Sequence, residues 1–162
     1  MSTQPATHET WSPPTFQERV AALVGGTTFR QPVGGRGTGQ DHMPAAHAVA
    51  AALAFVKRGD NDIGPDVAVA MALGSDHKRA AIIAALAKAM KLDRHPLCRR
   101  NLAAMGYIAN VAFDIVVHGR HRGRVSSITQ DDWDMLVPSA CRVLEALADA
   151  ALAEAEGCWR RK

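Results

Sequence analysis

The chain has 162 residues, of which 48% are hydrophobic, 5% aromatic and 22% charged, with a net charge of +3 and a pI near 9.0. This length favours one domain whose hydrophobic core needs no disulfide or metal to support it. The three widely spaced cysteines indicate neither a disulfide framework nor a zinc ribbon, and no apolar run approaches the roughly 20 residues that span a bilayer. The first residues lack a signal-peptide pattern, so we expect a cytoplasmic protein that makes no membrane contact.

Helix signals recur along the whole chain, and no stretch alternates with the period of a strand. Alanine supplies much of the hydrophobic fraction, which favours closely packed helices. Stretches with the periodicity or the boundary residues of a helix are 16–24, 44–58, 65–74, 76–91, 96–118 and 130–157. A glycine-rich loop, 27–43, follows the first of them, and Pro138 should kink or split the last.

These elements predict an all-α fold, a single compact domain of five or six helices with a Gly-rich N-terminal loop. We expect residues 1–43 to form a flexible N-terminal arm with one short helix, and residues 44–162 to form the helical domain. The stretch 96–118 carries an almost continuous apolar set, so we expect it to be the buried centre of the domain.

Charge is divided unevenly along the sequence. From Asp76 to Arg124 the chain carries ten Lys and Arg residues against three acids. From Val125 to Lys162 it carries seven acids against four bases. A basic middle can bind a polyanion while an acidic end contacts a protein, so this pattern favours a regulator with two kinds of partner.

The segment 66–86 resembles a helix-turn-helix motif. Ala70 precedes Gly74 by four residues, and apolar residues fall where the two helices would pack. The N-terminal end of the second helix, which would read base edges and phosphates, then carries His77, Lys78 and Arg79. The alternative is two ordinary core helices joined by a glycine turn, because the second helix is very apolar for one exposed along a DNA groove.

The densest cluster of positive charge is the stretch 119–124, which we call the basic loop. Its glycines let the backbone follow a phosphate chain, and arginine binds phosphate oxygens through two parallel hydrogen bonds. We therefore predict nucleic-acid contacts from Arg120, Arg122 and Arg124. A solvated turn without a ligand is the alternative for this loop.

No constellation of residues indicates catalysis. The seven histidines are scattered, and none pairs with a cysteine or carboxylate at metal-ligand spacing. No Ser–His–Asp or Cys–His arrangement stands out, and we expect Cys98 to be a buried thiol and not a nucleophile. The sequence thus predicts a protein that acts by binding, with no enzyme activity, metal or cofactor.

The C-terminal part resembles a known family. The run from Ile128 to Trp133, followed by a helix with late acids, is similar to the end of the lambda-type phage late antitermination proteins. Looser likenesses to the same family occur upstream, in 37–55 and in 102–114. The family carries a central cysteine-rich zinc module, whereas this chain has only the basic loop at that place.

The resemblance implies a small transcription regulator of phage or mobile-element type, since that family binds promoter DNA and engages RNA polymerase to override pausing and termination. Carried over, residues 77–79 and the basic loop would contact DNA. The candidate surface for RNA polymerase or another protein partner consists of Asp131, Asp132 and Trp133.

A second hypothesis has no nucleic-acid partner. In it the chain is a protein-binding inhibitor or adaptor, and the alanine-rich faces of its last two helices form the interface with a partner or with a second copy in a homodimer. The arginines of the basic loop distinguish the two hypotheses, because only the first needs them.

Overall fold

The computed structural model describes residues 14–15, 18–20, 53–54, 56–59, 62–90 and 95–159. The helices with defined bounds are α3 (Gly64–Leu73), α4 (Arg79–Met90), α5 (Pro96–Arg100), α6 (Leu102–His118) and α7 (Gln130–Trp159). Within the described ranges there is no strand, and the all-α prediction is confirmed. The predicted loop 27–43 and most of the predicted helix 44–58 lie outside the described residues.

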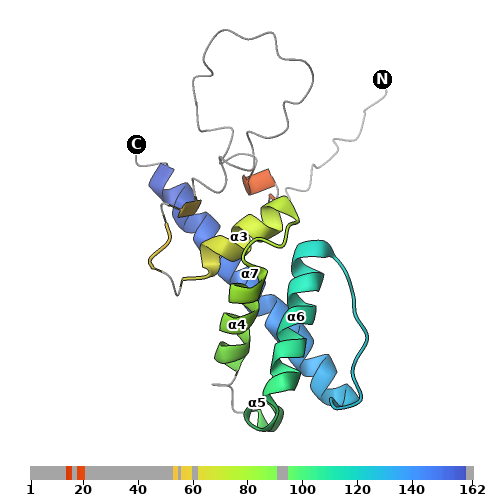
Figure 1. The fold of residues 1–162 in the computed structure, drawn as a ribbon. Coiled ribbons are helices and arrows are strands. Elements are labelled where there is room, and N and C mark those ends of the chain that lie inside the picture. Colours follow the sequence, from red (N-terminus) through yellow and green to blue (C-terminus); the bar gives the residue numbers. More distant parts are fainter. Residues whose placement is uncertain are drawn as a thin grey trace, which may run out of the picture.

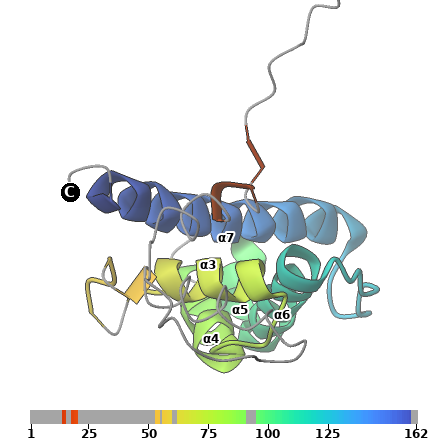
Figure 2. The ribbon, with the colours of Figure 1, turned by 90° about the horizontal axis from the view of Figure 1, so that it is seen from above.

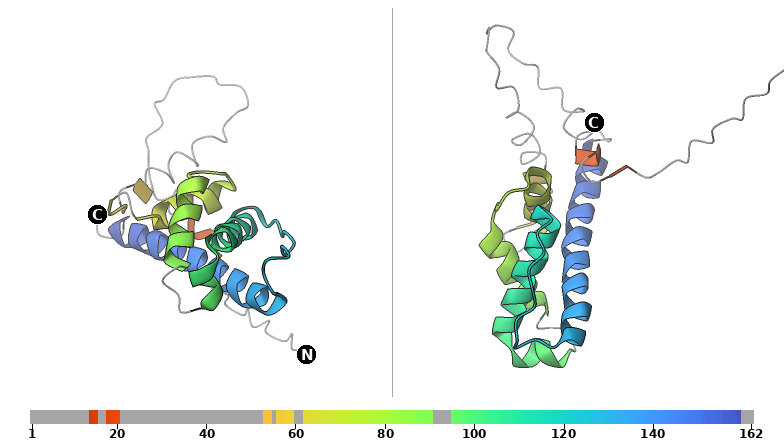
Figure 3. Two further views of the ribbon diagram at one scale, coloured as in Figure 1. Left: turned by 60° about the horizontal axis from the view of Figure 1, so that its bottom comes forward. Right: turned by 90° about the vertical axis from the view of Figure 1, so that its right-hand side faces the viewer.

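The helices pack in two layers (Figure 1). Figure 2 shows α3, α4, α5 and α6 on one side and α7 running along the other. The side view in Figure 3 shows the same arrangement, with α5 at the end of the molecule where α6 begins. The contacts of α7 are most extensive with α3 and α6, so these two helices of the first layer are joined through α7.

Helix α6 is the centre of the core, as its apolar sequence predicts. The side chains of Met105, Ile108 and Phe113 are completely buried on it. Leu144 and Leu152 of α7 are buried against this layer as well. Burying a large apolar side chain stabilises a fold by about 1.5–3 kcal/mol, so the α6–α7 contact is a principal source of stability.

The turn between α3 and α4 differs from the prediction. Gly74 has φ of +55°, a left-handed conformation that ends α3 as expected of a C-terminal glycine. The next helix does not begin at residue 76 as predicted, however, because Lys78 also has positive φ, +47°. This conformation is incompatible with a right-handed helix, and α4 begins only at Arg79, whose N–H donates to the Asp76 carbonyl oxygen at 3.1 Å.

The predicted helix 96–118 is in fact two helices. Asn101 has extended backbone angles, φ −134° and ψ 90°, and separates α5 from α6. Its side-chain oxygen accepts a hydrogen bond from the Ala104 N–H at 3.0 Å, which starts α6. Asparagine stabilises a new helix N-terminus in this way, and here that preference prevails over the apolar periodicity.

Helix α7 continues through Pro138 without interruption, so the predicted split is wrong. Proline removes one backbone hydrogen bond inside a helix, but Pro138 lies on the exposed side of α7. Buried side chains on both sides of it, among them Leu136 and Ala140, hold the helix in place. Thr129 caps the start of α7, because its Oγ1 accepts a hydrogen bond from the Asp132 N–H at 3.2 Å.

The short described part of the N-terminal region packs on the domain. Thr15 and Glu18 cap each other, since Thr15 Oγ1 accepts from the Glu18 N–H at 3.3 Å and the Glu18 carboxylate accepts from the Thr15 N–H at 2.6 Å. Val20 is buried in the core, and Arg19 forms ion pairs with acids of α7. These contacts place this part of the predicted arm against α7.

Candidate nucleic-acid interface

Arg79, a predicted DNA contact, is directed into the junction of α4 and α6. Its Nη2 donates to Asp114 Oδ1 at 2.6 Å and to Asn110 Oδ1 at 2.7 Å. The guanidinium also lies over the Phe113 ring, 5.0 Å from its centroid. Asp114 is only 1% exposed, so this arginine neutralises a buried carboxylate that would be costly to leave alone.

The same arginine reaches the turn before α4. Its Nη1 donates to Asp76 Oδ1 at 2.8 Å, and His118 Nε2 lies 3.0 Å from that oxygen. The Arg79 guanidinium, and after it His118, hold the pKa of Asp76 below its usual value. These contacts fasten the turn before α4 to the C-terminal end of α6.

The other two predicted residues of this segment surround a second acid. Asp66 of α3, whose side chain is 11% exposed, lies 3.2 Å from Lys78 Nζ and 3.5 Å from His77 Nε2. Lys57 Nζ lies on its other oxygen at 2.9 Å. Burial alone would raise the pKa of Asp66, but the hydrogen bonds from Lys57 and Lys78 outweigh it and hold this pKa below its usual value.

The segment 77–79 is therefore not the start of an exposed recognition helix. His77 and Lys78 lie in the turn before α4, which corrects their predicted position, and only Arg79 belongs to the helix. All three side chains face acids of their own chain. In this geometry the three side chains join α3, α4 and α6. This arrangement agrees with the alternative interpretation of the segment, two core helices joined by a glycine turn.

The basic loop, in contrast, is exposed along its whole length. It leaves the end of α6 and runs back beside that helix toward the start of α7 (Figure 1). In the part of the chain that the structure describes, the side chains of Arg120 and His121 make no ion pair or hydrogen bond. The side chain of Arg122 is 49% exposed, although its Nε lies 2.5 Å from Asp114 Oδ2. The loop thus presents several cations to solvent.

Contacts with neighbouring residues hold the basic loop in one conformation. The Tyr107 hydroxyl donates to the Gly123 carbonyl oxygen at 2.8 Å. Arg124 donates through Nη1 to the Ile128 carbonyl oxygen and through Nε to Gln130 Oε1, the latter at 3.2 Å. Together with the Arg122–Asp114 pair, these bonds fix the loop while leaving Arg120 and His121 free to meet a ligand.

The sequence interpretation missed the residues that organise these cations, Asp66, Tyr107 and Asp114. The sequence around Asp114 could have indicated its role, because a lone carboxylate inside a strongly apolar helix needs a partner when it is buried. Nothing in the sequence around Asp66 indicated its role, since an acid in the first turn of a helix is common. The partners of both acids come from other elements, which a count of charge along the chain does not reveal.

Two of the three residues predicted to bind a protein partner make contacts within the protein itself. Trp133 is half-buried, and its ring centroid lies 6.1 Å from that of Tyr107. Asp132 lies 3.3 Å from His95 Nε2, which joins the start of α7 to the start of α5. Asp131 is exposed and, among the described residues, forms no ion pair. Of the three, Asp131 alone has the geometry of an available surface charge.

Acidic residues near the C-terminal end of α7 also form ion pairs. Arg19 lies 3.1 Å from Asp149 and 3.0 Å from Glu156, and Arg58 lies 2.7 Å from Glu154. The hydrogen bond that Arg19 donates to the Glu156 carboxylate raises the pKa of Arg19. These acids hold the N-terminal part of the chain on the domain.

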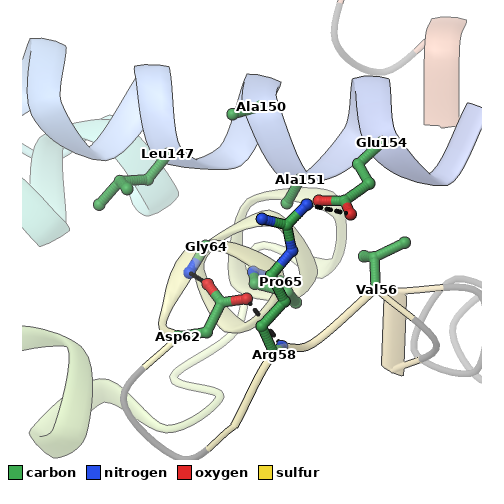
Figure 4. Close-up of a pocket in the computed structure, with 9 residues that line it drawn as sticks. All are labelled: Val56, Arg58, Asp62, Gly64, Pro65, Leu147, Ala150, Ala151 and Glu154. Atoms are coloured by element: carbon green, nitrogen blue, oxygen red, sulfur yellow. Dashed lines mark hydrogen bonds and ion pairs between the residues drawn. The ribbon is translucent and has the colours of Figure 1, made fainter. Parts of the chain in front are cut away.

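A hollow of about 380 Å³ lies between α7 and the segment that leads into α3 (Figure 4). Its charged groups already have partners: Arg58 pairs with Glu154, and the Asp62 carboxylate accepts the backbone N–H groups of Arg58 and Gly64 at 3.0 and 3.3 Å. The remaining wall is apolar. The hollow therefore offers no unpaired charge to a ligand, and we assign it no function.

Helix α7 has an uncharged face that flanks the side packed on the core. Residues three or four positions apart make it up: Met135, Ser139, Val143, Ala146, Ala150 and Ala153. Met135 is 53% exposed and Val143 42%. A small hollow of about 110 Å³ opens beside this face, between α4, α5 and α7. An exposed apolar face of this kind is typical of surfaces that meet another protein.

Among the described residues, no three His, Cys, Asp or Glu side chains gather as metal ligands, and no helix is both long and apolar enough to cross a bilayer. Comparison of the chain with protein-family models, with curated proteins and with solved structures gave no match. The resemblance to phage late antitermination proteins stays a prediction.

Proposed function

We propose that this protein binds nucleic acid through the basic loop and acts by binding, not by chemistry. One observation supports this proposal above the others: the loop is exposed, positively charged and held in place by the rest of the fold. A loop whose backbone is already ordered loses less entropy when it binds, and an arginine guanidinium can donate two parallel hydrogen bonds to the oxygens of one phosphate. Residues 77–79 are not part of this proposed site.

The proposed biological role is regulation of transcription. It comes from the resemblance to the phage late antitermination proteins and from the unequal distribution of charge. In this proposal the basic loop holds DNA while the start of α7, with Asp131 exposed, contacts a protein such as RNA polymerase. Asp132 and Trp133 would support that contact indirectly, through His95 and Tyr107.

The proposal is tested by binding to a random-sequence DNA duplex at several salt concentrations. Affinity should fall steeply with salt, because neutralised phosphates release counterions. Arg120→Gln should reduce the slope of log affinity against log salt by about one, the loss of a single phosphate contact. Arg120 is the residue to change because Arg122 and Arg124 also hold the loop.

Arg142→Gln is the matched control. It removes one exposed charge from α7, so the net charge changes as in Arg120→Gln while the basic loop stays intact. The control should keep the salt slope of the unmodified protein. No DNA binding at low salt, or equal effects of the two variants, would count against the proposal.

The uncharged face of α7 supports a second candidate, a protein-binding adaptor that pairs with a second copy of the chain or with another protein. Exposed Met135 and Val143 favour it. Val143→Glu should then abolish self-association in sedimentation experiments, whereas Arg120→Gln should leave it unchanged. A monomer at all concentrations would remove the homodimer version of this candidate.

A further inference from the structure

The contact between Asp114 and the basic loop has two parts. The Asp114 carbonyl oxygen accepts a hydrogen bond from the Arg120 N–H at 3.0 Å, and Asp114 Oδ2 lies 2.5 Å from Arg122 Nε. In the described structure Oδ2 accepts no hydrogen bond of ordinary geometry, so the charge of Arg122 is its compensation. The other oxygen is held by Arg79. One buried residue therefore fixes the loop through its backbone and its side chain.

Tyr107 provides a second attachment, about two turns of α6 nearer the N-terminus. Its hydroxyl binds the carbonyl of Gly123, the residue next to Arg122. The side chains of Asp114 and Tyr107 thus hold the loop beside α6 at two adjacent residues, Arg122 and Gly123. Arg120 and His121 precede these positions and remain exposed. The loop backbone that carries them is held by residues that carry no positive charge themselves.

We propose that Asp114, together with Tyr107, is a positioning residue that presets the basic loop for a polyanion. The inference rests on the proposed function and names the residues on which its affinity depends. It has an unusual consequence: a negatively charged residue strengthens binding to a negatively charged ligand. The charge of Asp114 is compensated by Arg79 and Arg122 and is buried, so its repulsion of a phosphate is small compared with the gain from an ordered loop.

Asp114→Asn distinguishes a positioning role from an effect of net charge, because the two predict changes in DNA affinity of opposite sign. Removal of a negative charge should tighten DNA binding if only net charge matters. If Asp114 positions the loop, the variant should bind random duplex DNA more weakly, by about threefold to tenfold. Glu145→Gln is the control, since it removes an exposed acid of α7 that forms no described ion pair and should bind as tightly as the unmodified protein or slightly more so.

Tyr107→Phe is the second test variant. It removes one hydroxyl and no charge, so it should weaken DNA binding in the same direction while keeping the fold. Affinity is measured well below the melting temperature of each variant, where a residue that only contributed to stability would have no effect. If Asp114→Asn does not fold, Tyr107→Phe decides the question.

Limited digestion with trypsin gives a readout without DNA. Trypsin cleaves after arginine, and an ordered loop resists it more than a loose one. Both variants should be cut faster within 119–124 than the unmodified protein. Unchanged digestion, or DNA affinity that is equal or higher in the folded variants, overturns the inference. If the unmodified protein itself does not bind DNA, the proposed function fails instead, so the two failures are distinguishable.

Discussion

Arg79 Nη2 and Asp114 Oδ1 lie 2.6 Å apart, although the two residues are 35 positions apart in the sequence. The pair joins the first turn of α4 to the last turns of α6 and buries the carboxylate between them. Arg79 was a candidate for reading DNA, yet its side chain completes the interior of the protein. Its substitution should therefore affect stability far more than binding.

Arg79→Ala should lower the free energy of unfolding by about 3 kcal/mol, because it leaves a buried carboxylate with Arg122 alone. Lys88→Ala is the control, since Lys88 is exposed on the same helix and its loss should change stability by less than about 0.5 kcal/mol. Urea unfolding measures both. Equal stability of the two variants would show that Asp114 does not depend on Arg79.

Gly74 and Gly106 should respond in opposite directions to the same substitution. Gly74→Ala should cost about 1 kcal/mol, because φ of +55° disfavours any residue with a Cβ. Gly106→Ala, inside α6 with no atom within 4 Å of the added carbon, should stabilise by about 0.5–1 kcal/mol. Thermal melts of the two variants test the pair. A neutral Gly74→Ala would contradict the left-handed end of α3.

Asp66 should make stability depend on pH in the acid range. Its pKa is lower in the folded protein than in the unfolded chain, so its contribution is complete above the unfolded value of about 3.9 and is lost as the pH falls through the folded value. Asp66→Asn should be less stable at neutral pH by about 1–3 kcal/mol, but should lose less stability on acidification below about pH 4. Unfolding midpoints at several pH values test this.

Glu145→Gln is the comparison for the acid-range experiment, because that carboxylate is exposed in the middle of α7 and forms no ion pair in the described chain. Its stability should follow that of the unmodified protein over the whole pH range. If Asp66→Asn follows it too, the lysines beside Asp66 do not stabilise its ionised form.

Pro138 offers a route to a more stable protein. Because α7 is continuous there, Pro138→Ala restores the missing backbone hydrogen bond and should raise stability by roughly 1–3 kcal/mol. Ala150→Pro, at another exposed position inside the same helix, should do the reverse. Melting temperatures compare them. A loss of stability in Pro138→Ala would mean that the ring makes packing contacts that outweigh the hydrogen bond.

Sequence reasoning identified the class of fold and most of the helices because apolar periodicity and boundary residues act locally. Gly74 and Thr129 are examples, each with a short-range hydrogen-bonding or conformational reason. The errors have local causes as well. Lysine is not expected at positive φ, so nothing in the sequence indicated the turn at Lys78. Asn101 caps the start of α6 at a point where the apolar periodicity continues, so the sequence pattern predicted one helix in place of two.

The candidate site was less accessible to sequence reasoning. A run of basic residues indicates where positive charge lies, but not which cations face acids within the fold. Lys78 and Arg122 look alike in the sequence, yet one helps to join two core helices and the other belongs to an exposed loop. Their different roles come from Asp66 and Asp114, which approach from other elements only after the chain has folded.

The long helix α7 has a consequence for the order of events in the cell. It is the last of these elements to be synthesised, and yet α3 and α6 bury their apolar sides against it. While α7 is still being synthesised, the apolar sides of α3 and α6 that it will cover are therefore exposed to other proteins. The domain should acquire its structure late in synthesis, and chaperones that recognise apolar segments would find it most accessible in that interval.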